Sequence, residues 1–210
     1  MKDLFTIIYY TSNREDEAFE AKVRRKLLEV KGDIPIISIS HKPIDFGKNI
    51  CIGEHEPSNV LIYKQILLGC KAAVSPFIIS AEADFLYCPE YFAFIPPKKD
   101  KIYRYHHIGL LWKHHWGFFR KLYSEGAQIA GREYLISLFE RRLEGASEGK
   151  NKFDPYRNLQ FEMFGGENYC LTFKTGQALH KATGVLHTRS WPAMPPWGTA
   201  EAVRKEMFNI

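Results

Sequence analysis

The sequence LFTIIYYTSNREDEAFEAKVRRKLLEVKGDIPIISI, residues 4–39, decides the fold. Residues 4–10 and 34–39 are short runs of apolar, β-branched and aromatic side chains, which is typical of strands buried on both faces. Between them, apolar residues recur with helical spacing at positions 19, 23, 27 and 30, and Gly32 ends the pattern. Ser12 and Glu15 have the spacing of a capping box, which predicts that the helix begins there. The order strand, helix, strand predicts a parallel, doubly wound α/β sheet.

The rest of the chain continues this alternation. A loop over 41–58 is followed by a helix over 59–73 and a short buried strand over 76–81, which stops at Glu82-Ala83-Asp84. Further on we expect strands over 91–95 and 102–112, a helix or a strand, turn and helix over 126–143, a mobile loop over 144–155 and a terminal helix over 199–208. No repeat or low-complexity tract divides the chain, so one domain is expected.

Composition excludes several classes of protein. Of the 210 residues, 45% are hydrophobic and 25% are charged, which excludes a disordered or fibrous chain. No apolar run reaches 18 residues, so no membrane-spanning helix is expected, and the N-terminus resembles a first strand more than a signal peptide. The four cysteines have no CxxC spacing, which favours free thiols in the cytoplasm (the host cytoplasm if a phage encodes the chain). The net charge of +5 permits a polyanionic partner or nucleotide phosphates.

The acidic turn Glu82-Ala83-Asp84 lies at the carboxyl end of the third predicted strand. Ligands of open α/β sheets bind outside the carboxyl ends of the strands. Two carboxylates at i and i+2 of an extended segment can face one ligand together. Carboxylate oxygens suit Mg²⁺ or Mn²⁺, which can bridge to phosphate oxygens. The alternative interpretation is a solvated acidic turn after a strand.

Four segments together resemble the GT-A glycosyltransferases. They are IIYYTSNR (7–14), ISISHKPIDFGKNI (37–50), YKQILLG (63–69) and FIISAEADFLYCPEYF (77–92). The resemblance is greatest to small phage and environmental proteins of the inverting, family-2-like group, and it covers residues 4–95. It implies a GT-A, Rossmann-like, open mixed sheet with helices on both faces. It also implies a nucleotide-sugar-binding half over 1–95 and an acceptor-binding half over 96–210 of a single domain.

The resemblance also implies roles for individual residues. Asp84 would bind Mn²⁺ or Mg²⁺, and Glu82 would contact the ribose or a water on the metal. The nucleotide of a UDP-sugar would lie against residues that follow the first two strands or lie on the next helix: Tyr10, Thr11, Asn13, Arg14, Ser40, His41, Lys42, Pro43, Lys64 and Gln65. His180 and His187 are candidates for a further metal ligand, and each has a purely structural role as its alternative.

An inverting transferase needs a general base for the acceptor hydroxyl. Glu162 and Glu167 lie beside the Gly-Gly turn in FEMFGGENYC and are the candidates, with no basis for choosing between them. Glu133 is a further carboxylate, but its position in GREYLISLFERR favours an ion pair on a helix. A polar loop without a catalytic role is the alternative for Glu162 and Glu167.

Aromatic and basic residues alternate over 103–121, which suits a sugar platform or contact with nucleic acid, or else a half-buried strand. The sequence therefore predicts a metal-dependent, inverting glycosyltransferase with a UDP-sugar donor. The phage-like resemblance extends the candidate acceptors to a 5-hydroxymethylated pyrimidine in DNA. The alternative is a nucleic-acid-binding module with a degenerate transferase fold. A nucleotidyltransferase is disfavoured because no glycine-rich phosphate loop follows the first strand.

Overall fold

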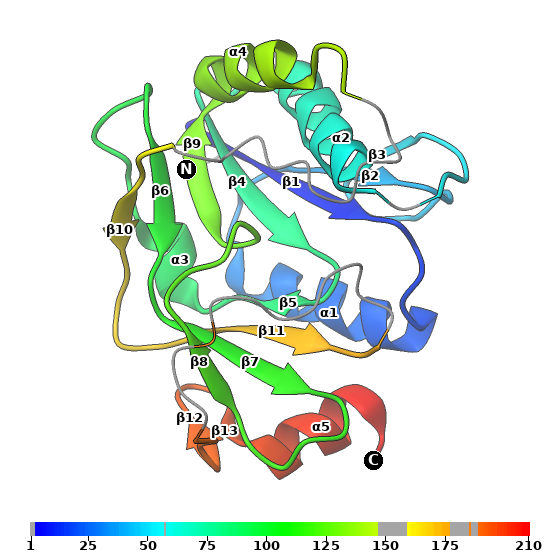
Figure 1. Cartoon of the computed structure of the whole chain (residues 1–210), viewed down its shortest axis with the longest axis vertical. Helices are drawn as coiled ribbons and strands as arrows, with labels where there is room; N and C mark the ends of the chain where they lie inside the picture. The colour runs from blue at the N-terminus through cyan, green and yellow to red at the C-terminus, as the bar shows by residue number, and fades with distance from the viewer. Residues whose placement is uncertain (1–2, 57, 147–158, 177–184, 186–188) are drawn as a thin grey trace.

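The computed structural model describes residues 3–56, 58–146, 159–176, 185 and 189–210. In chain order the elements are β1 Phe5–Thr11, α1 Glu17–Val30, β2 Ile36–Ser40, β3 Lys48–Cys51, α2 Asn59–Ala72, β4 Phe77–Glu82, β5 Phe85–Leu86, α3 Pro89–Ala93, β6 Ile102–Tyr105, β7 Ile108–Trp112, β8 Phe119–Lys121, β9 Gln128–Gly131, α4 Arg132–Leu143, β10 Glu162–Phe164, β11 Cys170–Lys174, β12 Ala193–Met194, β13 Gly198–Thr199 and α5 Ala200–Phe208 (Figure 1). Within this part of the chain, no helix is both long and apolar enough to cross a membrane.

A seven-stranded mixed sheet with the order β10-β6-β9-β4-β1-β2-β3 forms the centre of the molecule. Strands β1 to β4 are parallel where they pair, whereas β9 runs antiparallel to both β4 and β6. A smaller sheet with the order β5-β11-β7-β8 lies below the large one in Figure 1. The open mixed α/β sheet expected from the sequence is therefore confirmed.

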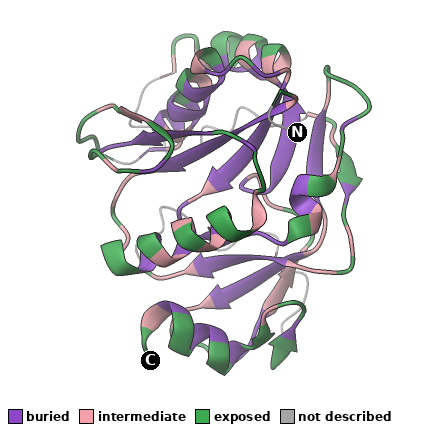
Figure 2. Cartoon of the chain, turned by 180° about the vertical axis from the view of Figure 1, so that it is seen from behind, coloured by how far each residue is buried: buried purple, intermediate pink, exposed green. Residues whose placement is uncertain are grey.

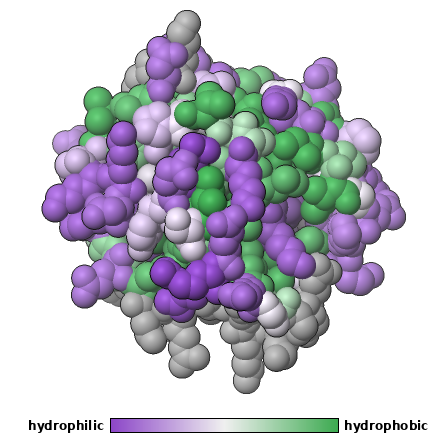
Figure 3. Space-filling view, turned by 90° about the horizontal axis from the view of Figure 1, so that it is seen from above, coloured by the Kyte–Doolittle hydropathy of each residue, from purple (hydrophilic) through white to green (hydrophobic). Residues whose placement is uncertain are grey.

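Helices cover both faces of the large sheet, as expected. Side chains of α2 and α4 pack with Ile8, Ile39 and Ile78 on one face. On the other face, Leu27 of α1 and Tyr91 of α3 pack with strand residues that include Ile7 and Ile79. The central strands β6, β9, β4, β1 and β2 of the large sheet are buried, whereas the outer faces of the helices are exposed (Figure 2). The face at the α4 end carries both hydrophilic and hydrophobic side chains (Figure 3).

The first helix begins later than its sequence signal predicts. Asp16, and not Ser12, is the N-cap of α1, and its carboxylate accepts the backbone N–H of Phe19 at 3.0 Å. Glu15 instead accepts a hydrogen bond from the Thr175 hydroxyl at 2.8 Å. The capping-box prediction is therefore wrong, because a second acidic side chain in the same loop makes the cap and a distant residue binds Glu15.

Other boundaries also differ from the expectation. The predicted strand over 91–95 is wrong, because Pro89 starts a short helix, α3. The predicted strand over 102–112 is two strands, which pair in different sheets and are separated by His106 and His107. The predicted loop over 41–58 contains the edge strand β3, and 126–143 forms β9 followed directly by α4. Most of the loop expected over 144–155 lies outside the described residues.

Candidate functional site

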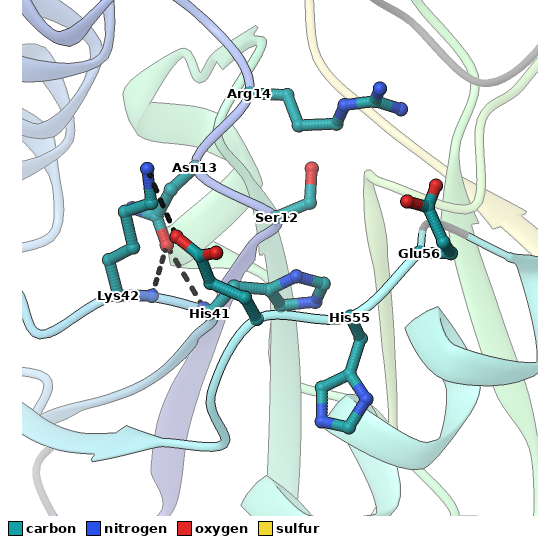
Figure 4. Close-up of a pocket in the computed structure, with 8 residues that line it drawn as sticks. Ser12, Asn13, Arg14, His41, Lys42, His55 and Glu56 are labelled. Atoms are coloured by element: carbon teal, nitrogen blue, oxygen red, sulfur yellow. Dashed lines mark hydrogen bonds and ion pairs between the residues drawn. The ribbon is translucent and has the colours of Figure 1, made fainter.

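A pocket of about 380 Å³ opens where the loops after β1 and β2 meet the loop before α2 (Figure 4). It is lined by Ser12, Asn13, Arg14, His41, Lys42, Glu54, His55 and Glu56. Four of these, Asn13, Arg14, His41 and Lys42, are among the residues expected to bind the nucleotide. The loop over 54–56 was not expected to take part, because only the fold brings it beside the ends of the strands.

Asn13 joins the two strand ends that form the pocket. Its backbone is left-handed, with φ 53°, a conformation that Asn adopts more readily than most residues. Its side-chain Oδ1 accepts the backbone N–H groups of His41 at 3.0 Å and Lys42 at 2.9 Å. Its own N–H donates to the hydroxyl oxygen of Thr11 at 2.8 Å. These bonds fix the loop after β1 against the loop after β2.

Histidine and charged side chains give the pocket its polarity. His41 is buried, its ring lies edge-on to His55 at 5.7 Å, and its Nε2 has no hydrogen bond to any described residue. Burial lowers the pKa of His41, and the charge of His55 lowers it further. Lys42 pairs with Glu54 at 3.4 Å between Nζ and Oε1, while Arg14 is exposed at the rim. The pocket therefore presents histidine and cationic side chains together with the carboxylates of Glu54 and Glu56.

Two of the expected nucleotide-binding residues are buried beneath the pocket. The Thr11 hydroxyl donates to Glu20 at 2.9 Å. The Gln65 amide donates to the carbonyls of Thr11 at 3.0 Å and Ile39 at 3.2 Å. Gln65 therefore holds the ends of β1 and β2 together and does not face the pocket from α2, contrary to the expectation.

Three more of the expected residues do not line the pocket. Ser40 is buried, and its hydroxyl accepts a hydrogen bond from Asn49 of β3 at 2.9 Å. Pro43 and Lys64 are exposed outside the pocket lining. The directions of these side chains depend on the register of the strand and the pitch of the helix. A residue's position in the sequence after a strand does not reveal that direction.

The acidic turn lies at the same edge of the sheet, after β4. Glu82 Oε1 accepts the hydroxyl of Tyr10 at 2.8 Å, and its backbone N–H donates to the hydroxyl of Tyr87 at 2.9 Å. Burial, together with the charge of Asp84, raises the pKa of Glu82 to about 7. Burial also raises the pKa of Asp84, with Lys174 acting in the opposite direction. The turn is therefore a half-buried acidic site held in place by two tyrosines.

Two lysines from the small sheet face this turn. Lys174 Nζ lies 3.7 Å from Asp84 Oδ2. Burial lowers the pKa of Lys121, the like charge of Lys174 lowers it further, and Glu82 and Asp84 oppose the shift. Neither lysine was assigned to this site from the sequence, because Lys174 is a single basic residue at the end of a short strand and Lys121 stood out only as part of the aromatic and basic stretch over 103–121. Only the pairing of β5 with β11 brings Lys174 beside Asp84.

The pocket and the acidic turn are joined by a hydrogen bond between distant segments. Glu15 follows the pocket residue Arg14, and Thr175 follows Lys174. The Thr175 hydroxyl donates to Glu15 at 2.8 Å. The pocket and the Asp84–Lys174 pair therefore form parts of one continuous edge.

Only part of the expected site for Mn²⁺ or Mg²⁺ falls within the described residues. They contain no group of three His, Cys, Asp or Glu side chains that could hold a metal ion. The ammonium group of Lys174 lies next to Asp84, the expected principal ligand. The two histidines expected to complete such a site, His180 and His187, lie outside the described residues.

The glutamates expected to act as the general base lie elsewhere. Glu162 is on the edge strand β10, three strands and about 14 Å across the sheet from β4, and it is paired with Lys101. Glu167 is exposed and precedes β11, whereas Lys174 is at the far end of that strand. Glu133 forms an ion pair on α4, with Arg132. The placement of Glu162 and Glu167 does not favour proton transfer at the acidic turn.

Glu125 is a carboxylate that the sequence analysis did not single out. Its Oε2 accepts the hydroxyl of Tyr63 at 2.9 Å, and its Oε1 lies 3.5 Å from Arg104. The next residue, Gly126, lies directly against the carboxylate of Glu82, where a Cβ would collide with it. Glu125 therefore lies at the same edge as the acidic turn, on a segment from the second half of the chain.

Comparison with known proteins identifies the fold. No protein-family model and no curated protein sequence matches the chain. The structure is similar to S. aureus TarS 1-349 in complex with UDP-GlcNAc, with a TM-score of 0.51 and 11% identity over 90% of this chain and 62% of that chain. It is also similar to the inositol-1-phosphate CTP transferase from T. maritima, with a TM-score of 0.54 and 11% identity over 84% of this chain and 92% of that chain.

A third similar structure is HddC from Yersinia pseudotuberculosis, with a TM-score of 0.50 and 14% identity over 80% of this chain and 93% of that chain. This chain spans less than two thirds of the TarS fragment. At these identities the likenesses show the fold alone. The chain thus has the GT-A-like α/β fold that the sequence segments resemble.

Proposed function

We propose that the chain is a glycosyltransferase that moves a sugar from a UDP-sugar to an acceptor hydroxyl. One observation carries the proposal: a pocket after β1 and β2 continues, through the Glu15–Thr175 hydrogen bond, to a charged cluster after β4. A nucleotide sugar needs both parts, because its nucleoside must be held and the charge on its leaving diphosphate must be stabilised. The GT-A-like fold, with its site at the carboxyl ends of parallel strands, supports this assignment.

The arrangement supports a proposed geometry for the transfer of the sugar. The nucleoside would lie against Asn13 and His41, with the diphosphate directed towards Asp84. An acceptor hydroxyl would attack the anomeric carbon opposite the leaving diphosphate, which inverts the configuration. Glu125 is our proposed proton acceptor in place of Glu162 and Glu167, because it lies beside Gly126 and Glu82.

The acceptor side carries aromatic rings paired with cations. The Arg120 guanidinium lies 5.4 Å from the ring centre of Tyr169 and 5.1 Å from that of Trp191. Arg204 lies 4.4 Å from the ring centre of Trp116, which is exposed. Such pairs suit an acceptor with stacking rings and phosphates, so we include DNA containing a 5-hydroxymethylated pyrimidine among the proposed acceptors.

The experiment is a turnover assay with a panel of UDP-sugars, with and without hydroxymethylated DNA, read by mass spectrometry of the products. The wild type should consume at least one UDP-sugar. Asp84→Asn should lower kcat/KM by about a hundredfold or more, and Asp100→Asn, at an exposed position, should leave it unchanged. Glu125→Gln should lower kcat while the affinity for UDP changes little.

Two other outcomes would replace the proposal. Release of pyrophosphate from CTP or UTP with a sugar phosphate would make the chain a nucleotidyltransferase. The loop Ser12–Arg14 after β1, which contains no glycine, does not favour that function. Salt-sensitive DNA binding without any turnover would instead favour a nucleic-acid-binding module.

A further inference from the structure

The two lysines of the small sheet project from the same face of that sheet. Lys174 pairs with Trp112 and Cys170 pairs with Ile108 between β11 and β7, and Ile108 pairs with Lys121 between β7 and β8. Because Lys174 is four residues from Cys170, an even separation, its side chain is on the same face as that of Lys121. The ends of two different strands therefore place cationic groups on one surface.

That surface faces the large sheet and the acidic turn. Cys170 and Ile108, on the lysine face, pack in one core cluster with Ala83, the middle residue of the turn. Leu171 and Phe173, on the opposite face, pack in a different cluster with α1 and α5. The alternation of side chains along β11 thus directs Lys174 into the space beside Asp84, where the two atoms are 3.7 Å apart.

A divalent cation on Asp84 would have to share this space with Lys174. The Lys174 and Asp84 side chains are 19% and 18% exposed, so water screens their charges only in part. A double positive charge about 4 Å from an ammonium group would be strongly repelled at such a site. A lysine and a metal ion therefore compete for the same carboxylate.

We propose that Lys174 and Lys121 bind the donor's diphosphate and take the place of a divalent cation. The ammonium group of Lys174 has three donors, so it can keep Asp84 as a partner and still bind phosphate oxygens. Lys121, which interacts with Glu82, Asp84 and Lys174, supplies the second positive charge. Asp84 acts as a positioning residue for Lys174 and not as a metal ligand. This inference rests on the proposed function and specifies how its donor is held.

The position of the lysines relative to the pocket fits a nucleoside diphosphate. Thr175, next to Lys174, is hydrogen-bonded to Glu15, and the residues before Glu15 line the pocket. A nucleoside held against Asn13 and His41 would therefore direct its phosphates towards Lys174. Arg14, exposed at the rim, adds a third positive charge along this route.

The test is calorimetric binding of UDP and of uridine to the full chain, each with EDTA and with excess Mn²⁺. Wild-type affinity for UDP should change by less than about twofold between the two conditions. Lys174→Met should weaken UDP binding about tenfold or more, because a charge-assisted contact is lost, and should leave uridine binding unchanged. Lys174→Arg should retain most of the UDP affinity, and Lys98→Met, at an exposed site remote from the turn, should retain all of it.

Lys121→Met is a second, independent variant, which should also weaken UDP binding, but by less than Lys174→Met. Circular dichroism checks that each variant is folded. If UDP binds only with Mn²⁺ and Lys174→Met has no effect, the lysine proposal is overturned while the UDP-sugar proposal stands. If neither UDP nor uridine binds under either condition, the donor assignment fails and this inference fails with it. Should Lys174→Met lose uridine as strongly as UDP, a structural role for Lys174 would replace the phosphate-binding role.

Discussion

The side-chain amide of Asn13 holds the two loops that form the pocket, so its loss should affect stability and binding together. Asn13→Ala removes hydrogen bonds to the N–H groups of His41 and Lys42 and places Ala at φ 53°. We expect the free energy of unfolding to fall by about 2–3 kcal/mol. Asn13→Gly, which tolerates the backbone conformation, should lose about 1 kcal/mol less, and Asn13→Asp should lose least because it keeps the acceptor. Urea unfolding measures all three, and equal losses for Ala and Asp would contradict the hydrogen-bond explanation.

Glu20 should make stability depend on pH. Its side chain is buried, it accepts the Thr11 hydroxyl at 2.9 Å, and burial raises its pKa from 4.5 to about 7. Because the folded chain then holds a proton that the unfolded chain releases, the free energy of unfolding should fall as pH rises from 4.5 to 7, by roughly 1 kcal/mol per unit.

The pKa of Glu82 is also raised to about 7, so Glu82 likewise makes the free energy of unfolding fall as pH rises. Glu20→Gln should therefore reduce the slope by about half without abolishing it. Urea unfolding of the wild type and of Glu20→Gln at pH 5, 6, 7 and 8 gives the pH dependence of the free energy of unfolding for each protein. A variant whose slope equals that of the wild type would assign the pH dependence to other groups.

At the scale of elements, Gly69 sets the distance between α2 and β1. Glycine in a helix normally costs about 1 kcal/mol relative to alanine, so replacing an exposed helical glycine with alanine would stabilise the chain. Here a Cβ would lie 2.5 Å from Cγ2 of Ile8 and 3.0 Å from its Cδ1. We therefore expect Gly69→Ala to lower the free energy of unfolding by about 1–3 kcal/mol. Leu68→Ala, on the exposed side of α2, should cost less than about 1 kcal/mol, and a stabilised Gly69→Ala would show that the helix can move away from β1.

The elements that local patterns define were predictable, and those that distant partners define were not. β1, α1, β2, α2 and β4 all follow from apolar runs and helical spacing, because each buries its own apolar face. β3 escaped prediction because it is short, half of its residues are polar and it lies at a sheet edge. α3 looked like a strand because aromatic side chains dominate it, and these pack inwards as readily from a short helix.

The candidate site divides in the same way. Asn13 and His41 could be found because each follows a strand whose carboxyl end was predictable. Lys174 and Glu125 could not, because they reach this edge through pairings of β11 and β9 that no local pattern encodes. Glu162 drew attention through its neighbouring glycines, yet its strand joins the far edge of the sheet.

At the scale of the whole molecule, the two sheets share one core. Residues of β1 and β4 from the large sheet pack in a single cluster with Phe85 of β5, Ile108 of β7 and Cys170 of β11. The charged site lies between these sheets, since Asp84 follows one and Lys174 ends a strand of the other. The geometry of the site therefore depends on the two sheets remaining packed together. Whether the two sheets unfold as one unit can be measured by urea unfolding.

The positions of the tryptophans allow that coupling to be tested. All four, at 112, 116, 191 and 197, belong to the part of the chain around the small sheet, whereas α1, α2 and α4 dominate the helical signal. Because the sheets share a core, tryptophan fluorescence and far-ultraviolet circular dichroism should give the same urea midpoint.

Phe208→Ala should shift both midpoints together. The ring of Phe208 stacks on Phe19 of α1 at 5.0 Å and meets Phe173 of β11 edge-on at 5.4 Å. Phe208 therefore joins α5 to both α1 and the small sheet. We expect the free energy of unfolding to fall by about 2–3 kcal/mol. Ile210→Ala, two residues on and half exposed, should change it little. If the fluorescence transition moved to lower urea while the circular dichroism transition stayed in place, the small sheet would unfold as a separate unit, and the lysines would be held independently of the acidic turn that they face.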